Sequence, residues 1–167
     1  MVRARSQTSL AVSANARDWF VLNASPDLRL QIEATGVLHP REGLRSSPIT
    51  GVVATGGDVD AIAGLLHLRE RHRFSVYAPS RVLAVLAANP IFNVLSPDCV
   101  QRIELPLGKR IELAAASGVA GLALTAFNVP AKVPLYLENA DEETVGNAMT
   151  LAWQNTSTKT KRPQSLR

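Results

Sequence analysis

Residues 52–66 read Val52-Val53-Ala54-Thr55-Gly56-Gly57-Asp58-Val59-Asp60-Ala61-Ile62-Ala63-Gly64-Leu65-Leu66. An apolar run is joined to a second apolar segment through a glycine turn that carries two carboxylates. This order predicts a buried strand, a short turn and a helix. Short turns at the carboxyl ends of strands are where open α/β sheets bind their ligands. The segment therefore predicts an α/β fold with a polar site at the end of this strand.

Strand and helix patterns continue on both sides of this segment. Residues 9–13 and 18–23 alternate around a turn and predict a β-hairpin, and Ser25-Pro26-Asp27 predicts the start of a helix that ends near Gly36. We expect a strand at 49–54, a helix at 59–71, a strand at 74–78 and a helix that opens at Pro79. After Pro97 the period changes to two, which predicts strands at 100–105, 110–113 and 120–129. The order predicts a mainly parallel sheet covered by helices, followed by further strands.

Composition limits the class of protein. The 167 residues are 46% hydrophobic, which fits a globular domain, and charged or amide residues interrupt every apolar run before it reaches the length of a membrane span. The basic first residues lack an apolar segment behind them, so we expect a cytoplasmic protein. The single cysteine, Cys99, excludes an internal disulfide or a cysteine-rich zinc site within the chain.

The net charge of +4 is concentrated at the end of the chain. Lys159, Lys161, Arg162 and Arg167 lie in a segment with almost no large aliphatic residues, so we predict a body at 1–150 and a disordered basic tail at 151–167. We also expect a polar, flexible loop at 37–48.

Asp58 and Asp60 are the first candidates for chemistry. At alternate positions in a turn they could bind one cation, although an aspartate before a helix also caps free backbone N–H groups, and we favour capping for Asp58. No spacing pairs His39, His67 or His72 as metal ligands.

A second polar turn, Asn23-Ala24-Ser25-Pro26-Asp27, also follows a strand and precedes a helix. Its side chains could equally act as helix caps. If both turns lie at one sheet edge, Asn23, Ser25 and Asp27 would line a pocket rim with the two aspartates. Gly56-Gly57 lacks the Lys-Ser/Thr of a phosphate loop, and no Gly-x-Ser-x-Gly motif is present.

Four blocks together resemble one known family: Arg5-Ser6-Gln7-Thr8-Ser9-Leu10-Ala11-Val12-Ser13, Val21-Leu22-Asn23-Ala24-Ser25-Pro26-Asp27, Asp60-Ala61-Ile62-Ala63-Gly64-Leu65-Leu66-His67-Leu68-Arg69-Glu70 and Pro90-Ile91-Phe92-Asn93-Val94-Leu95. In this order they resemble the family of pyrroloquinoline quinone (PQQ) biosynthesis protein B, over roughly residues 3 to 146. The resemblance implies the N-terminal part of a metallo-β-lactamase-like αββα sandwich, classed as α/β or α+β, in which residues 56–61 match the family's metal motif. Only Asp60 keeps a ligand-type residue. Gly56 and Asp58 stand at histidine positions, and Ala61 stands where the family usually has a histidine.

The resemblance implies a function in a cofactor pathway. It suggests a role in synthesis of PQQ, or in transport of PQQ or its peptide-derived precursor to the periplasm, with other PQQ-synthesis proteins as partners. It also implies a divalent metal, iron or zinc, and metal-dependent hydrolase or oxygenase chemistry. The loss of ligand positions, however, predicts weak metal binding, no catalytic residue and no oxygenase activity in this chain alone. The alternative is a catalytically inert, truncated remnant or binding module of the fold. A nucleic-acid binder is a third hypothesis that depends only on the basic tail, and unpaired strands predict self-association.

Overall fold

The structure is a computed structural model that describes residues 6–41, 43, 46–115, 118, 121–128 and 135–138, the last four by their backbone alone. The strands are β1 (Leu10–Val12), β2 (Trp19–Leu22), β3 (Ile49–Val53), β4 (Phe74–Ala78), β5 (Val100–Glu104), β6 (Arg110–Glu112), β7 (Ala123–Ala126) and β8 (Leu135–Glu138). The helices are α1 (Leu28–Ala34), α2 (Val59–Ile62) and α3 (Ser80–Ala88), followed by the 3-10 helices η1 (Gly36–Leu38), η2 (Ala63–Leu68) and η3 (Pro90–Val94), respectively. The predicted tail at 151–167 lies outside the described residues.

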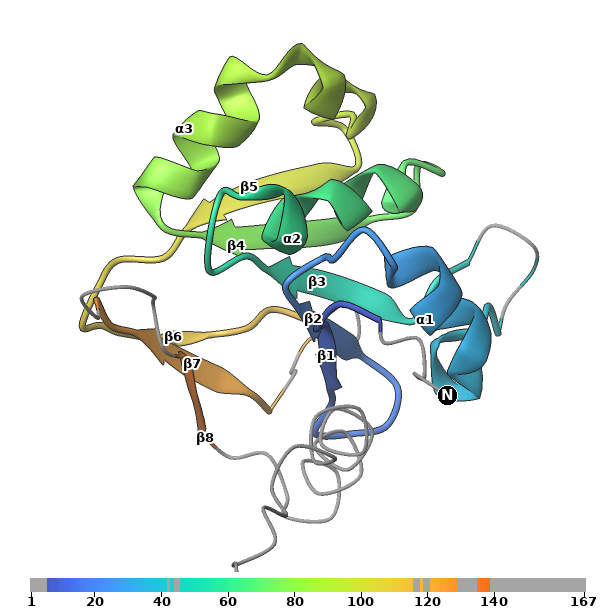
Figure 1. Ribbon diagram of the computed structural model, residues 1–167. Coiled ribbons are helices and arrows are strands. Elements are labelled where there is room, and N and C mark those ends of the chain that lie inside the picture. Colours follow the sequence, from blue (N-terminus) through green and yellow to red (C-terminus); the bar gives the residue numbers. More distant parts are fainter. Residues whose placement is uncertain are drawn as a thin grey trace, which may run out of the picture.

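The first sheet has five strands in the order β1-β2-β3-β4-β5 (Figure 1). β1 and β2 form the antiparallel hairpin that the sequence predicts, and β2 through β5 run parallel. Each parallel connection crosses over through a helical segment. Because β2 and β3 point the same way, the turns that follow them lie at the same edge of the sheet.

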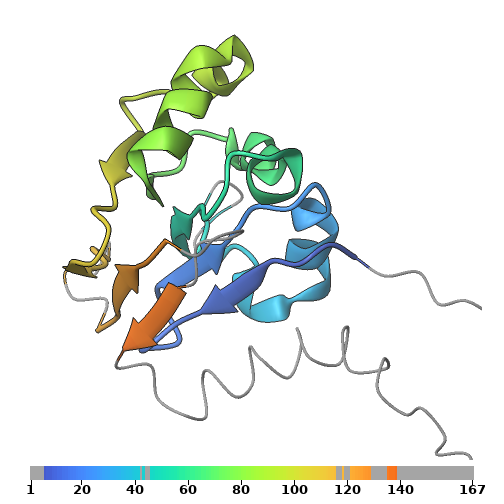
Figure 2. The same ribbon diagram turned by 60° about the vertical axis from the view of Figure 1, so that its left-hand side comes forward.

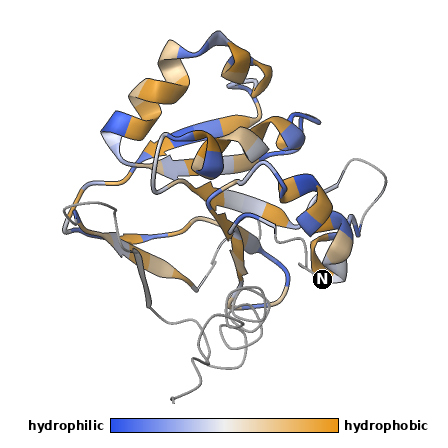
Figure 3. Ribbon diagram, in the orientation of Figure 1, coloured by the Kyte–Doolittle hydropathy of each residue, from blue (hydrophilic) through white to orange (hydrophobic). Residues whose placement is uncertain are grey.

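The helices cover one face of this sheet (Figures 1 and 2). Alternate strand residues point into this layer, among them Val21, Val52 and Val76, and they pack against buried Leu65 and Leu86 of the helical segments. Figure 3 shows apolar residues along the strands and on α3. The period of two in the strands therefore divides the core between the two faces of the sheet.

A second sheet, with the antiparallel order β6-β7-β8, lies against the opposite face (Figure 2). Phe20, Val53 and Tyr77 from the first sheet pack with Leu113 and Leu124 to form a second apolar cluster between the sheets. The backbone N–H of Ala114 donates to Tyr77 Oη over 3.0 Å, which ties the fully buried tyrosine to the segment after β6. One helical layer and two sheets are thus present in the described residues, in agreement with the predicted sandwich.

The predicted helix at 59–71 differs from the observed structure. Only Val59–Ile62 is α-helical, and Ala63–Leu68 is a 3-10 helix. Gly64 N–H donates to Ala24 O over 2.8 Å, and Ala61 O accepts from Ala24 N–H over 2.8 Å. Both groups would belong to the ladder of a regular α-helix, so their use in tertiary contacts ends the α-helical pattern after one turn.

The other predicted elements are present, most of them with shorter bounds, and β4 has the predicted bounds 74–78. The first helix begins at Leu28 and ends at Ala34, and the predicted loop at 37–48 begins within η1. Of the three late strands, β5 and β6 begin at the predicted residues and end one residue early, and β7 occupies only the central part of the segment 120–129.

Candidate functional site

Two turns meet at the carboxyl edge of the first sheet. Residues 23–27 follow β2, and residues 54–58 follow β3. Asn23 N–H donates to Val53 O over 2.8 Å, and Asn23 Oδ1 accepts from both the N–H and the hydroxyl of Thr55 at 2.9 Å. Asn23 has a φ of +58°, in the left-handed region that asparagine tolerates better than most residues. The backbone of the first turn is therefore fixed directly against the second.

The helical segment after the second turn also contacts the first turn. Besides the two hydrogen bonds between Ala24 and residues 61 and 64, the Gly64 Cα approaches so closely that an added Cβ would lie 2.2 Å from Ser25 O. Ser25 is fully buried, and its hydroxyl lies 3.1 Å from Gln31 Oε1 on α1. Ser25 therefore lies beneath the rim rather than on it, unlike the other polar residues predicted there.

Gln7 makes hydrogen bonds to Asp27 and to Asp60. Its backbone N–H donates to Asp27 Oδ2 over 2.7 Å, and its side-chain Nε2 donates to Asp60 Oδ1 over 2.8 Å. Gln31 Nε2 donates to the Gln7 carbonyl, and Ser9 Oγ accepts from Ser25 N–H over 3.1 Å. Gln7, which precedes β1, thus connects Asp27 to Asp60.

Asp58 is exposed beside this pair. Its backbone has the extended conformation of an N-cap, and its carbonyl accepts from the N–H groups of Ala61 and Ile62, but its side chain makes no capping hydrogen bond. The same absence applies to Asp27 before α1. The favoured interpretation of Asp58 as a side-chain cap is therefore wrong.

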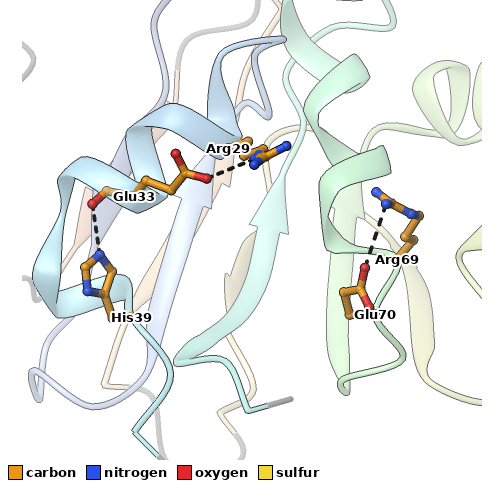
Figure 4. A network of polar contacts seen from close by, with 5 residues as sticks. All are labelled: Arg29, Glu33, His39, Arg69 and Glu70. Carbon is orange, nitrogen blue, oxygen red and sulfur yellow. Dashed lines mark hydrogen bonds and ion pairs between the residues drawn. The ribbon is translucent and has the colours of Figure 1, made fainter. Parts of the chain in front are cut away.

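The rim carboxylates have no cationic partner among the described residues. Ion pairs there join Arg29 to Glu33 at 2.9 Å and Arg69 to Glu70 at 3.8 Å in the helical layer (Figure 4), and Arg110 to Glu112 at 3.1 Å on β6. Asp27 and Asp60 instead accept hydrogen bonds from an uncharged amide. The rim therefore presents carboxylate oxygens that can accept from N–H or O–H groups of a ligand.

Among the described residues, no hydrogen bond or ion pair joins any of the three histidines to a rim carboxylate. His39 Nε2 lies 3.0 Å from Glu33 O (Figure 4). His72 stacks on Phe74 with a 5.0 Å centroid separation, its Nε2 is buried without a partner in the described part of the chain, and burial lowers its pKa despite the opposing effect of Glu70. His67 lies in η2. No contact of the described residues brings any of them to Asp60.

Asp58 and Asp60 could bind a metal ion only together with further ligands. Within the described ranges, no group of three or more His, Cys, Asp or Glu residues is arranged to hold one. Ala61 is 5% exposed and packs in the helix-side core, so this position adds no ligand. Zinc sites use three or four protein ligands, so these residues alone do not fit an iron or zinc centre.

The chain is similar to known proteins over most of its length. The family described as "Beta-lactamase superfamily domain" matches residues 18–158. The chain is 52% identical to "Coenzyme PQQ synthesis protein B" of Gluconacetobacter diazotrophicus over 155 residues, which cover 87% of this chain and 50% of that protein. It is 54% identical to the protein of the same name from Rhodopseudomonas palustris over 137 residues, with coverages of 81% and 44%.

Solved structures agree with these matches. The crystal structure of Zn(2+)-bound PqqB from Methylobacterium extorquens superposes with a TM-score of 0.75 at 46% identity, covering 83% of this chain and 47% of that one. A diphosphatase of the PhnP family, at 20% identity and a TM-score of 0.55, shares the fold, with coverages of 72% and 44%. The chain spans about half the length of the curated relatives it matches. No helix of the described segments is long and apolar enough to cross a membrane.

Sequence reasoning missed the residues that connect the rim. Gln7, Thr55 and Gln31 supply these hydrogen bonds, yet none belongs to a recognisable spacing pattern. Thr55 and Gln31 lie in or close to the predicted turns, which is the signal that could have suggested them, whereas Gln7 lies far from both turns in the chain and is marked only by its place in the block at residues 5–13.

Proposed function

We propose that this chain, which belongs to the β-lactamase superfamily and is a homologue of coenzyme PQQ synthesis protein B, acts in the biosynthesis of PQQ. The observation that carries this proposal is sequence identity near 50% over most of the chain to proteins of that name. The Asn-Ala-Ser-Pro-Asp turn and the Gly-Leu-Leu-His-Leu-Arg-Glu segment, which first indicated the family, both contribute to the rim or support it.

Within that pathway we assign the rim a binding role for PQQ or its peptide-derived precursor. Asn23 and Asp27 lie on the first turn and Asp60 lies in α2 directly after the second, and hydrogen bonds hold these segments together. Such a rim favours a ligand that brings N–H donors, as a peptide-derived precursor does. Asp58 and Asp60 remain candidates for weak contact with a divalent cation, and no reaction step is assigned to that cation.

The experiment is complementation of a PQQ-producing bacterium that lacks its own gene for this protein. The chain, its Asp60→Asn variant and a matched Glu33→Gln control on the exposed face of α1 are expressed in this strain. PQQ is measured separately in cells and in medium. Restoration by the chain and by Glu33→Gln, with reduced restoration by Asp60→Asn, is the expected result.

The location of PQQ distinguishes the two roles. Normal total PQQ with a restored fraction in the medium would favour transport of PQQ toward the periplasm, whereas a rise in total PQQ would favour a synthetic step. If neither quantity changes although the chain accumulates in a folded form, the proposed function is wrong.

The second candidate is an inert binding module or remnant of the fold. It is favoured by Ala61 at a position where the related family usually has a histidine, and by the absence of a three-ligand group in the described residues. Calorimetric titration of the purified chain with PQQ separates the candidates further. Binding without complementation would support a binding module, and no binding together with no complementation would support a remnant.

A further inference from the structure

We propose that β5 is a self-association surface at which a second copy of this chain adds an antiparallel strand, in the register that places Ile103 on the two-fold axis. β5 lies at the end of the first sheet (Figure 1), and in the described part of the chain it pairs only with β4. An edge strand of this kind offers a row of unpaired main-chain groups to another strand. This surface lies apart from the rim and does not depend on the proposed function.

The hydrogen bonds to β4 determine which groups of β5 remain open. Cys99 O accepts from Phe74 N–H, and Leu105 N–H donates to Ala78 O. Because N–H and C=O of one residue point to the same side and this side alternates along a strand, the odd-numbered residues face β4. The main-chain groups of Arg102 and Glu104 therefore face the open edge, whereas the N–H of Val100 donates to Ser96 O over 2.8 Å.

Only some registers of a second copy satisfy these groups. A two-fold axis through Ile103 places Arg102 of each copy opposite Glu104 of the other, and all four of these residues have their N–H and C=O directed across the interface. Arg102 of one copy and Glu104 of the other then form a hydrogen-bonded antiparallel pair. The Ile103 residues of the two copies form a closely spaced pair without hydrogen bonds.

The side chains favour this register over its neighbour. Two cross-strand pairs of opposite charge form when the axis passes through Ile103, whereas an axis through Arg102 would place two arginines opposite each other. Charges on an edge strand usually prevent association, but here their alternation makes the edge complementary to itself in one register. Pro106, which lacks an N–H, limits the length of the added pairing.

An adjacent hollow gives the second copy further surface to cover. A cavity of about 710 Å³ is lined by residues of β5 and of the preceding segment, among them Leu95, Pro97 and Ile103. Ile91 and Val94 on η3 are 58% and 47% exposed. An isologous contact of this kind closes as a dimer with two-fold symmetry and leaves no further open edge at β5.

The first experiment measures the mass of the complete 167-residue chain by sedimentation equilibrium over a dilution series. We expect a monomer–dimer equilibrium that Glu104→Arg weakens by about tenfold, because both cross-strand pairs become like-charged. The double variant Arg102→Glu with Glu104→Arg restores the opposite charges and should restore the dimer. Glu33→Arg, an exposed reversal on α1, is the matched control and should have no effect.

A second experiment tests the register directly. In a Cys99→Ser background, Ile103→Cys places two thiols in a pair whose Cα atoms lie about 4.5 Å apart, within disulfide range. Gln101→Cys is the control, because its two copies would lie about 13 Å apart along the strands. Rapid disulfide formation at position 103 and not at 101 supports the proposal.

Three outcomes would overturn it. They are a chain that stays monomeric at every concentration, a dimer that Glu104→Arg leaves unchanged, and crosslinking at position 101 in preference to 103. The first of these outcomes includes a monomer whose β5 edge binds only peptides of another protein. Because complementation does not enter these measurements, their failure would leave the proposed function in PQQ biosynthesis intact.

Discussion

Gly64→Ala is the substitution that most directly tests how the two turns are joined. A Cβ at this position would lie 2.2 Å from Ser25 O and 2.8 Å from both the Ala24 carbonyl carbon and Leu28 Cβ. The first distance is more than 1 Å shorter than the 3.4 Å at which ordinary contact begins. Two of the three atoms belong to the backbone, so no side-chain rotation can remove the overlap. The turn and η2 must therefore separate.

The cost follows from the contacts that separation disturbs. Overpacking costs about 1–3 kcal/mol, and stretching the two hydrogen bonds of Ala24 with residues 61 and 64 adds about 1 kcal/mol each. Alanine recovers up to about 1 kcal/mol through its higher helix propensity. We therefore expect Gly64→Ala to lower the free energy of unfolding by about 2–4 kcal/mol, a large part of the total for a domain of this size.

Equilibrium unfolding in urea measures this loss as a lower midpoint at constant slope. Gly36→Ala is the matched control, because no atom lies within 4 Å of a Cβ added there. The control should change the free energy of unfolding by less than about 0.5 kcal/mol. A loss below about 1 kcal/mol for Gly64→Ala, with unchanged amide exchange at Ala24, would refute the close contact between the turns.

Three further substitutions test other parts of the structure. Burial lowers the pKa of His72 below its ordinary 6.5. Its contribution to stability is therefore fully present above pH 6.5 and is lost as the pH falls through the pKa of the folded state. His72→Gln should remove this pH dependence from thermal unfolding curves. Tyr77→Phe removes the acceptor of the Ala114 N–H and should cost about 1 kcal/mol in urea unfolding, with no loss if the hydroxyl bond contributes nothing. Asn23→Ala loses two hydrogen bonds from Thr55 and keeps a positive φ, so we expect a loss of about 1–3 kcal/mol; an unchanged midpoint would contradict the coupling of the turns through this side chain.

The sequence predicted those features that depend on local pattern. Apolar runs ending in Asn23 and Thr55, and the proline at position 79, identified the ends of strands and the start of a helix, because burial and backbone geometry restrict such positions to a few residue types. The parallel direction of the strands then followed from the helical segments between them. The sequence leaves open whether the two polar turns share one sheet edge, and the structure places Asn23 and Asp60 at the same edge.

The features that the sequence did not predict depend on contacts between distant residues. Gly64 lies within an apolar helical pattern, yet its N–H bonds to Ala24, forty positions earlier in the chain, and the regular helix ends there. Asp58 had the position of a cap, but capping requires a side-chain direction that spacing alone does not determine. Gln7 lies too far from both aspartates in the chain for any local rule to connect them.

The partner of the two aspartates also affects how the rim can respond to a ligand. Gln7 holds Asp27 and Asp60 through N–H groups that carry no formal charge, and all three groups are accessible to solvent. Hydrogen bonds to charged groups contribute about 1.5–3 kcal/mol when they are protected from water, and less at exposed positions. An ammonium partner would add a Coulomb attraction that a ligand must also overcome. A ligand with N–H donors can therefore replace Gln7 at the carboxylates at modest cost, while the backbone bonds of Ala24 and Gly64 keep the turns in place.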